Sequence, residues 1–254
     1  MHPFILPFPL HTDIDECAEH GKCSQICTNT KGSYKCSCNA GYQLDLVGRD
    51  DDGVLHHGTC RAVSPPGTEE PALIFGNRRD IRKLALHSGH YETLVADTRS
   101  AIALDFDHDN GYLYWTDVTE EKIKRIRFGN TNNSQAEVLV DKDGVLTPDG
   151  VALDWVNQNL YWTDTGLDSI SMISLGGGDD KPRYRKTLVN TNLDEPRAIV
   201  VDPREGQRYV YYTDWGQNPR IVRMGLNGED PTVLVDREQV VWPNGLTIGE
   251  FLLI

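Results

Sequence analysis

The hexapeptide Asn159-Leu160-Tyr161-Trp162-Thr163-Asp164 belongs to a repeat. Its last four residues recur as Tyr114-Trp115-Thr116-Asp117 and, with one substitution, as Tyr211-Tyr212-Thr213-Asp214. The tyrosines that open the three copies are 47 and 50 residues apart. A fixed period of about 40–50 residues is typical of repeat proteins, and a blade of a β-propeller has this length.

Each copy of this tetrapeptide motif lies in a unit of four short β-type segments separated by turn residues. Four strands per unit at this period predict propeller blades, in which the first strand is covered on both sides and the Tyr-Trp pair fills the wedge between blades. In the first unit the segment before the motif is 102–105, and those after it are 123–126 and 137–140. The second unit has 151–154 before the motif and 170–173 and 186–189 after it. The third has 199–202 before it and 221–224 and 232–235 after it.

The aspartates of the motif, Asp117, Asp164 and Asp214, admit two interpretations. They could serve catalysis, but a catalytic carboxylate is needed at one place, and these occupy equivalent places on successive units. A carboxylate at a strand end also accepts hydrogen bonds from backbone N–H groups of the turn that follows. We therefore expect a structural role and predict no catalytic residue.

The composition excludes several classes of protein. Of the 254 residues 39% are hydrophobic, and no run of 18 apolar residues is present, so the sequence predicts no transmembrane helix. The net charge of −13 argues against nucleic acid as a partner. It favours basic ligands, although an acidic balance also serves solubility.

All six cysteines lie between Cys17 and Cys60. Dense cysteines in a short segment predict a disulfide framework made in an oxidising compartment, and hence an extracellular protein. A zinc site is the alternative, but zinc favours Cys-x-x-Cys pairs or histidines at regular spacing, and the gaps here are irregular. The spacing alone does not choose among the possible disulfide pairings.

Two stretches within residues 13–60 carry a specific pattern. They are Asp13-Ile14-Asp15-Glu16-Cys17 and the run 27–38, which reads Cys-Thr-Asn-Thr-Lys-Gly-Ser-Tyr-Lys-Cys-Ser-Cys. Together they resemble a calcium-binding EGF-like module. The disulfides that the resemblance implies are Cys17–Cys27, Cys23–Cys36 and Cys38–Cys60.

The same stretches offer ligands for Ca²⁺, which takes several carboxylate, amide and carbonyl oxygens. An acidic linker followed by a turn at Asn29 is the alternative, but the joint spacing favours calcium. The expected side-chain ligands are Asp13, Glu16 and Asn29, and the resemblance adds the backbone carbonyls of Ile14, Thr30 and Ser33.

The last loop of the module departs from the family pattern. It holds 21 residues between Cys38 and Cys60, where the family usually has fewer. We interpret the extra length as a polar insertion at a loop tip, which adds little closure entropy. Its run Asp50-Asp51-Asp52 is interpreted as a solvated acidic loop rather than a second metal site.

The rest of the chain divides into three segments. Residues 1–12 contain three prolines and lack the features of a signal peptide, so we expect an unstructured N-terminal segment in a piece of a longer secreted or membrane-anchored protein. Residues 61–71, with Pro65-Pro66-Gly67, predict a short stiff linker. The repeat region spans 72–254 and begins with strand-like stretches at 73–75 and 81–84 that lack the motif.

An EGF-like module followed by these repeats resembles the low-density lipoprotein receptor family, above all its large receptor-related members. The stretches 73–78, 148–155 and 213–216 add to the likeness, which covers nearly all of residues 13–249. The resemblance implies a six-bladed propeller, whereas residues 72–254 supply about four units. We therefore expect a mainly β protein with a small disulfide-rich module and an incomplete propeller of about four of six blades, whose open faces and strand edges favour aggregation.

The resemblance implies the non-catalytic extracellular portion of an endocytic lipoprotein-receptor-related protein that binds calcium and ligands and releases the ligands in acid compartments. Its partners would be lipoproteins or other secreted proteins and neighbouring receptor modules, at the outer side of the plasma membrane with cycling through endosomes. We expect no membrane contact within this chain and a membrane-anchored parent protein. The alternatives are a matrix or growth-factor-precursor protein with the same modules, or a calcium-dependent propeller hydrolase, which would need one acidic cluster in the central channel.

The sequence contains one acceptor site for N-glycosylation, Asn132-Asn133-Ser134. It lies in a polar stretch between two expected strands. In a secreted protein such a site is exposed to the glycosylation machinery, so we predict a glycan on Asn132.

Overall fold

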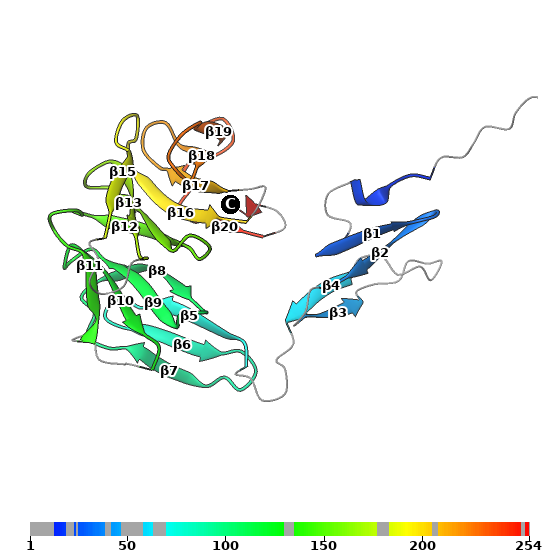
Figure 1. Ribbon diagram of the computed structural model, residues 1–254, viewed down its shortest axis with the longest axis horizontal. Helices are drawn as coiled ribbons and strands as arrows, with labels where there is room; N and C mark the ends of the chain where they lie inside the picture. The colour runs from blue at the N-terminus through cyan, green and yellow to red at the C-terminus, as the bar shows by residue number, and fades with distance from the viewer. Residues whose placement is uncertain are drawn as a thin grey trace, which may run out of the picture. The chain divides into compact units, whose positions relative to one another are not determined.

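A computed structural model describes residues 13–18, 23, 25–38, 42–46, 58–62, 70–129, 135–176, 183–204, 208–249 and 252–253. The chain divides into two compact units, Met1–Pro71 and Ala72–Ile254 (Figure 1). None of the described residues belongs to a helix long and apolar enough to cross a membrane.

The first unit is small and rich in β-structure. A short 3-10 helix, η1 (Glu16–Ala18), precedes the hairpin of β1 (Ile26–Thr30) and β2 (Ser33–Ser37), and β3 (Tyr42–Leu46) pairs with β4 (Gly58–Ala62). The tight turn between β1 and β2 needs a positive φ, which Gly32 supplies at 77°.

Disulfides replace a hydrophobic core in this unit. Among its described residues only Cys23 is buried, which is too little apolar burial to hold a fold. The pairs are Cys17–Cys27, Cys23–Cys36 and Cys38–Cys60, the pairing that the resemblance implies. The acidic run Asp50-Asp51-Asp52 lies outside the described residues.

The second unit contains three four-stranded antiparallel sheets, each in chain order from its inner to its outer strand. The inner strands lie side by side, β8 against β12 and β12 against β16, so that the sheets form consecutive propeller blades (Figure 1). The prediction of four-stranded blades is confirmed. The blades are β8 (Ala101–Asp107), β9 (Tyr112–Asp117), β10 (Lys122–Arg127), β11 (Glu137–Val140); β12 (Pro148–Asp154), β13 (Asn159–Asp164), β14 (Ser169–Ser174), β15 (Arg185–Val189); and β16 (Pro196–Asp202), β17 (Tyr209–Asp214), β18 (Arg220–Gly225), β19 (Thr232–Val235).

A further sheet precedes these blades, made of β5 (Ala72–Gly76), β6 (Ile81–Ala85) and β7 (Tyr91–Val95). Its register matches the second to fourth strands of a blade. Ile81 is fully buried, pairs with the end of the preceding strand and is followed by a bulge, as Ile123 is in β10. Gly76 and Asn77 therefore stand where the other blades have Thr-Asp.

The last strands of the chain are short. They are β20 (Thr247–Ile248), which lies near the inner strand β16, and β21 (Leu252–Leu253), which pairs with β20. The stretch 243–249 aligns with the start of the earlier inner strands, because Pro243 lies eight residues after Val235, the end of β19, as Pro148 lies eight residues after Val140, the end of β11.

The structure shifts the first inner run by two residues. In β8 the bulge falls between Ala101 and Leu104, and Leu104 pairs with Trp115 as Val151 pairs with Trp162. The counterpart of 151–154 is therefore 104–107, not 102–105. The apolar pattern cannot reveal this, because a bulge changes the hydrogen-bond register without changing the run of apolar residues.

The aromatic pair of each motif fills the space between blades. Tyr114 packs with Trp162 in one buried cluster, and Tyr161 packs with Tyr212 in the next. The tyrosine thus faces the following blade, and the residue after it faces the preceding blade. This confirms the prediction that the pair fills the wedge between blades.

Replacement of Trp162 by alanine should destabilise the repeat unit by about 3–5 kcal/mol, because the indole is fully buried between two blades. The matched control is Trp155→Ala, because that side chain is 51% exposed in a turn, and it should cost less than about 0.5 kcal/mol. Urea unfolding of both variants measures the difference. Equal midpoints for the two variants would contradict the wedge role.

Candidate functional site

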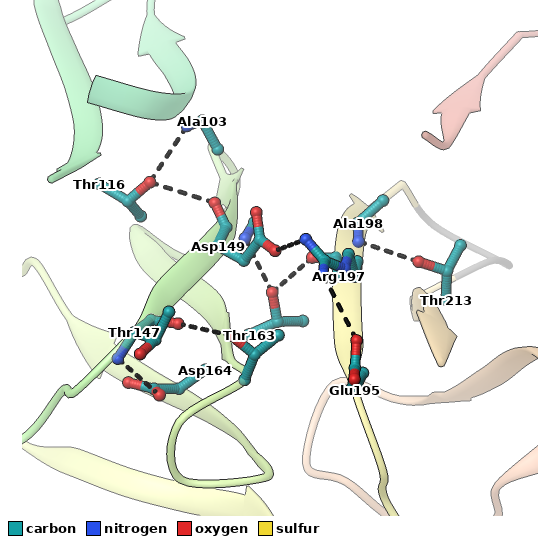
Figure 2. Close-up of polar contacts among 12 residues, drawn as sticks. Ala103, Thr116, Thr147, Asp149, Thr163, Asp164, Glu195, Arg197, Ala198 and Thr213 are labelled. Carbon is teal, nitrogen blue, oxygen red and sulfur yellow. Dashed lines mark hydrogen bonds and ion pairs between the residues drawn. The ribbon is translucent and has the colours of Figure 1, made fainter. Parts of the chain in front are cut away.

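The motif threonine joins two neighbouring blades. Thr163 Oγ1 accepts a hydrogen bond from Gly150 N at 2.8 Å and donates one to the backbone oxygen of Arg197 at 2.5 Å (Figure 2). Gly150 lies at the bulge of its own inner strand, where the ladder leaves an N–H group without a partner. Arg197 belongs to the inner strand of the next blade. One hydroxyl therefore closes a bulge and links two sheets.

Thr116 makes both equivalent bonds, and Thr213 makes the bond to its own inner strand. Figure 2 shows Thr116 between Ala103 N and the backbone oxygen of Asp149, both at 3.1 Å. Thr213 accepts from Ala198 N at 2.9 Å. The sequence interpretation assigned no role to these hydroxyls. The sequence does offer a clue to this role: threonine is the same in all three copies, although the aromatic residue before it changes.

Asp117 and Asp164 each hold two loops, and Asp214 holds one loop and the side chain of Arg220. Asp164 accepts hydrogen bonds from Leu146 N and Thr147 N, in the loop before the inner strand, and from Gly166 N and Leu167 N, in the turn after the motif. The sequence predicted only the second pair. The corresponding donors are Arg99, Ser100, Thr119 and Glu120 for Asp117, and Asp194, Glu195 and the side chain of Arg220 for Asp214.

These bonds define one end of the blades, which we call the motif end. The inner strands begin there, and the residue after each starting position forms a rim: Ile102, Asp149, Arg197 and, by alignment, Asn244. Because the four differ in charge and size while the motif beneath them is constant, the rim is the variable part of this end.

A polar cluster occupies the rim between two blades. Arg197 Nη1 lies 3.0 Å from Asp149 Oδ2 and its Nη2 lies 3.4 Å from Glu195 Oε2 (Figure 2). The guanidinium stacks 3.9 Å above the ring of Trp215. Arg197 Nε and Trp215 Nε1 are buried without a hydrogen-bond partner. Burial raises the pKa of Asp149, and the Arg197 charge opposes that rise.

Exposed apolar side chains also lie at the motif end. Val241 and Trp242 lie in the loop before the fifth inner strand and are 63% and 74% exposed. Tryptophan is enriched among the residues that contribute most to binding at protein interfaces. The sequence interpretation missed them. The sequence does offer a clue: Trp242 lies beside turn residues and outside the motif, where an aromatic side chain is not needed to fill the space between blades.

Two of the expected calcium ligands, Asp13 and Asn29, come together in the first unit. Asp13 Oδ2 accepts from Asn29 Nδ2 at 3.2 Å, and Asp13 Oδ1 accepts from Gly32 N at 2.6 Å, which brings together residues far apart in the sequence. Ser33 lies across the same turn, and its carbonyl accepts from Thr30 Oγ1 at 2.7 Å. The side chain of Ile14 is exposed, so only its backbone could serve as a ligand.

Glu16 lies in η1, which contacts both strands of the hairpin. Its Oε2 is buried without a hydrogen-bond partner, which is costly for a carboxylate unless a cation lies beside it. Among the described residues no three acidic, histidine or cysteine side chains form a group that could hold a metal. A calcium ion here would therefore depend on Asp13 and Glu16 together with amide and backbone oxygens, a donor set that suits this hard cation.

Comparison with protein families identifies both units. Residues 13–53 match the calcium-binding EGF domain. Residues 111–155, 158–203 and 208–248 match the low-density lipoprotein receptor repeat class B. Each of these three matches begins within a turn before the motif and includes it.

Two relatives are similar to the chain over long stretches. Vitellogenin receptor Yl of Drosophila melanogaster is 31% identical over 240 residues, which cover 93% of this chain and 11% of the relative. Low-density lipoprotein receptor-related protein 5 of Mus musculus is 42% identical over 156 residues, which cover 61% of this chain and 9% of the relative. The chain thus spans about a tenth of the length of either relative.

Solved structures agree with the fold. A crystal structure of a nidogen/laminin complex superposes with a TM-score of 0.60 and 28% identity, over 69% of this chain and 65% of the other. A gluconolactonase from Xanthomonas campestris superposes with a TM-score of 0.52 at 16% identity, over 69% and 61%, which shows a shared fold alone.

Proposed function

This chain belongs to the low-density lipoprotein receptor family, and we propose that it is the ligand-binding extracellular portion of an endocytic receptor that releases its ligands in acid. Modules of this family are non-catalytic receptor modules that lie outside the cell. The motif carboxylates fit this reading, because their oxygens are occupied by loop N–H groups. They are not available to activate a substrate.

The motif end is the surface that we assign to the ligand. It combines an exposed tryptophan, Trp242, with the polar rim cluster around Arg197, on a frame held by buried motif bonds. A rigid frame with a variable rim suits recognition, because preorganised groups lose little entropy when they bind. The one observation that carries the proposal is Trp242, which no structural need within the described residues keeps exposed.

The ligand test uses vitellogenin, because the relative that matches most of this chain is named a vitellogenin receptor. Immobilised protein should bind vitellogenin at neutral pH, and Trp242→Ala should weaken binding about tenfold or more, as at interface hot spots. Trp155→Ala, exposed at the opposite end of the blades, should leave binding unchanged. A shift to about pH 5.5 should release bound vitellogenin.

The matrix alternative has one observation in its favour, the similarity to a structure of a nidogen/laminin complex. Laminin therefore serves as the second probe in the same assay. Binding of laminin without release in acid would favour the matrix alternative over the endocytic receptor. Loss of binding in both tryptophan variants would place the ligand surface elsewhere.

We further propose that Asp13, Glu16 and Asn29, with the carbonyls of Ile14, Thr30 and Ser33, hold Ca²⁺ in the EGF-like module. The affinity should lie in the range of extracellular modules, about 10⁻⁴–10⁻³ M. Glu16→Ala should weaken it about tenfold or more, because it removes the buried oxygen that has no other partner. Asp15→Ala is the matched control, since that carboxylate caps Cys17 N. Calorimetric titration that finds no calcium binding by the oxidised protein would refute the site.

Glycosylation of Asn132 remains a prediction, because this residue lies outside the described residues. Secretion of the protein from animal cells followed by glycosidase treatment should lower its mass. Asn132→Gln should abolish that loss, whereas Asn130→Gln, a nearby asparagine without the acceptor sequence, should not.

A further inference from the structure

We propose that Asp149 is the acid-responsive positioning residue of the rim. Its carboxylate holds the side chain of Arg197 across the joint between two blades at neutral pH, and its protonation releases that side chain while the joint stays closed. The inference rests on the proposed function, because it describes how the ligand surface changes in an acid compartment.

Asp149 is the contact that holds the Arg197 guanidinium from the neighbouring blade. Asp149 lies on β12, and Arg197 lies on β16, 3.0 Å away. The other contacts of the guanidinium, Glu195 at 3.4 Å and the ring of Trp215 at 3.9 Å, belong to its own blade. Loss of the Asp149 charge therefore leaves Arg197 attached to one blade, free to shift over Trp215.

The joint beneath this ion pair depends on neutral groups. Thr163 Oγ1, on the same blade as Asp149, donates to the backbone oxygen of Arg197 on the next blade. Apolar packing of Tyr161 and Tyr212 completes the contact between the two blades. Neither hydroxyls nor aromatic rings change charge between neutral and acid pH, so acid alters the rim without opening the joint.

Histidine, the usual sensor of mild acid, is remote from the rim. The histidines described in the repeat unit are His87, His90 and His108, which lie in turns at the opposite end of the blades. The charged groups around the ion pair are carboxylates and arginines. β12 contributes Asp149, β16 and the loop before it contribute Arg197, Glu195 and Asp194, and the adjoining turns and strands contribute Asp164, Asp168, Asp214 and Arg220.

The direction of titration supports release in acid. Burial raises the pKa of Asp149 despite the nearby Arg197, and burial together with Asp194, Asp214, Glu195 and Asp164 raises the pKa of Asp168. A carboxyl group whose pKa is higher in the folded state takes up its proton more readily there than in the unfolded chain. Protonation of Asp149 as the pH falls therefore favours the folded state, so the release of Arg197 does not weaken the fold.

The test follows the indole N–H resonance of Trp215 by NMR while the pH of the full, secreted protein is lowered. We expect one transition with a midpoint above the ordinary aspartate value of about 3.9. Asp149→Asn should abolish it. Asp143→Asn, which removes an exposed carboxylate at the same end, should retain it. The backbone N–H of Gly150, bonded to Thr163, should stay protected from hydrogen exchange throughout.

Two results would overturn the proposal: persistence of the Trp215 transition in Asp149→Asn, or loss of protection at Gly150 as the pH falls. Should Asp149→Asn fail to fold, the carboxyl carbon resonance of Asp149 in the unsubstituted protein gives the same answer, because an unshifted midpoint would also overturn it. No ligand enters this experiment. Its failure is therefore distinct from a failure of vitellogenin binding.

Discussion

The repeat unit depends on one hydroxyl per blade. Each inner strand carries a bulge, which leaves a buried N–H group outside the ladder, and such a group is costly without a partner. The motif threonine accepts from that group, and Thr116 and Thr163 also donate to the backbone of the next inner strand. The same atom therefore allows the bulge and sets the distance between two blades, which explains why the position tolerates no other residue in the three copies.

The rest of the motif follows from this contact. Once two inner strands are joined at the bulge, the sheets diverge outward, and the aromatic pair fills the space that opens. At the strand end the aspartate collects N–H groups from the loops on both sides of the sheet. These loops would otherwise present unpaired backbone at the motif end.

The residues that hold the fold are therefore different from the side chains that could contact a ligand. The buried motif residues hold the backbone, and they leave the side chains of the rim residues Ile102, Asp149, Arg197 and Asn244 without a structural role in common. Charge at the rim can therefore change between blades without disturbing the fold. Arg197 illustrates the point, because its backbone oxygen serves the joint while its side chain lies among Asp149, Glu195 and Trp215.

The sequence by itself determined the repeat, the number of strands per blade, the wedge role of the aromatic pair and the two-unit character of the chain. These features follow from periodicity and residue type, which are local properties. Hydrogen-bond register is not local. Only the tertiary structure placed the bulge and showed that Asp107, not Asp105, ends the first inner strand. It also showed that the stretch 74–77 occupies the motif position without the motif residues. The rim cluster was hidden for the same reason: Asp149 and Arg197 are 48 residues apart in the chain, and only the stacking of two blades brings them within 3.0 Å.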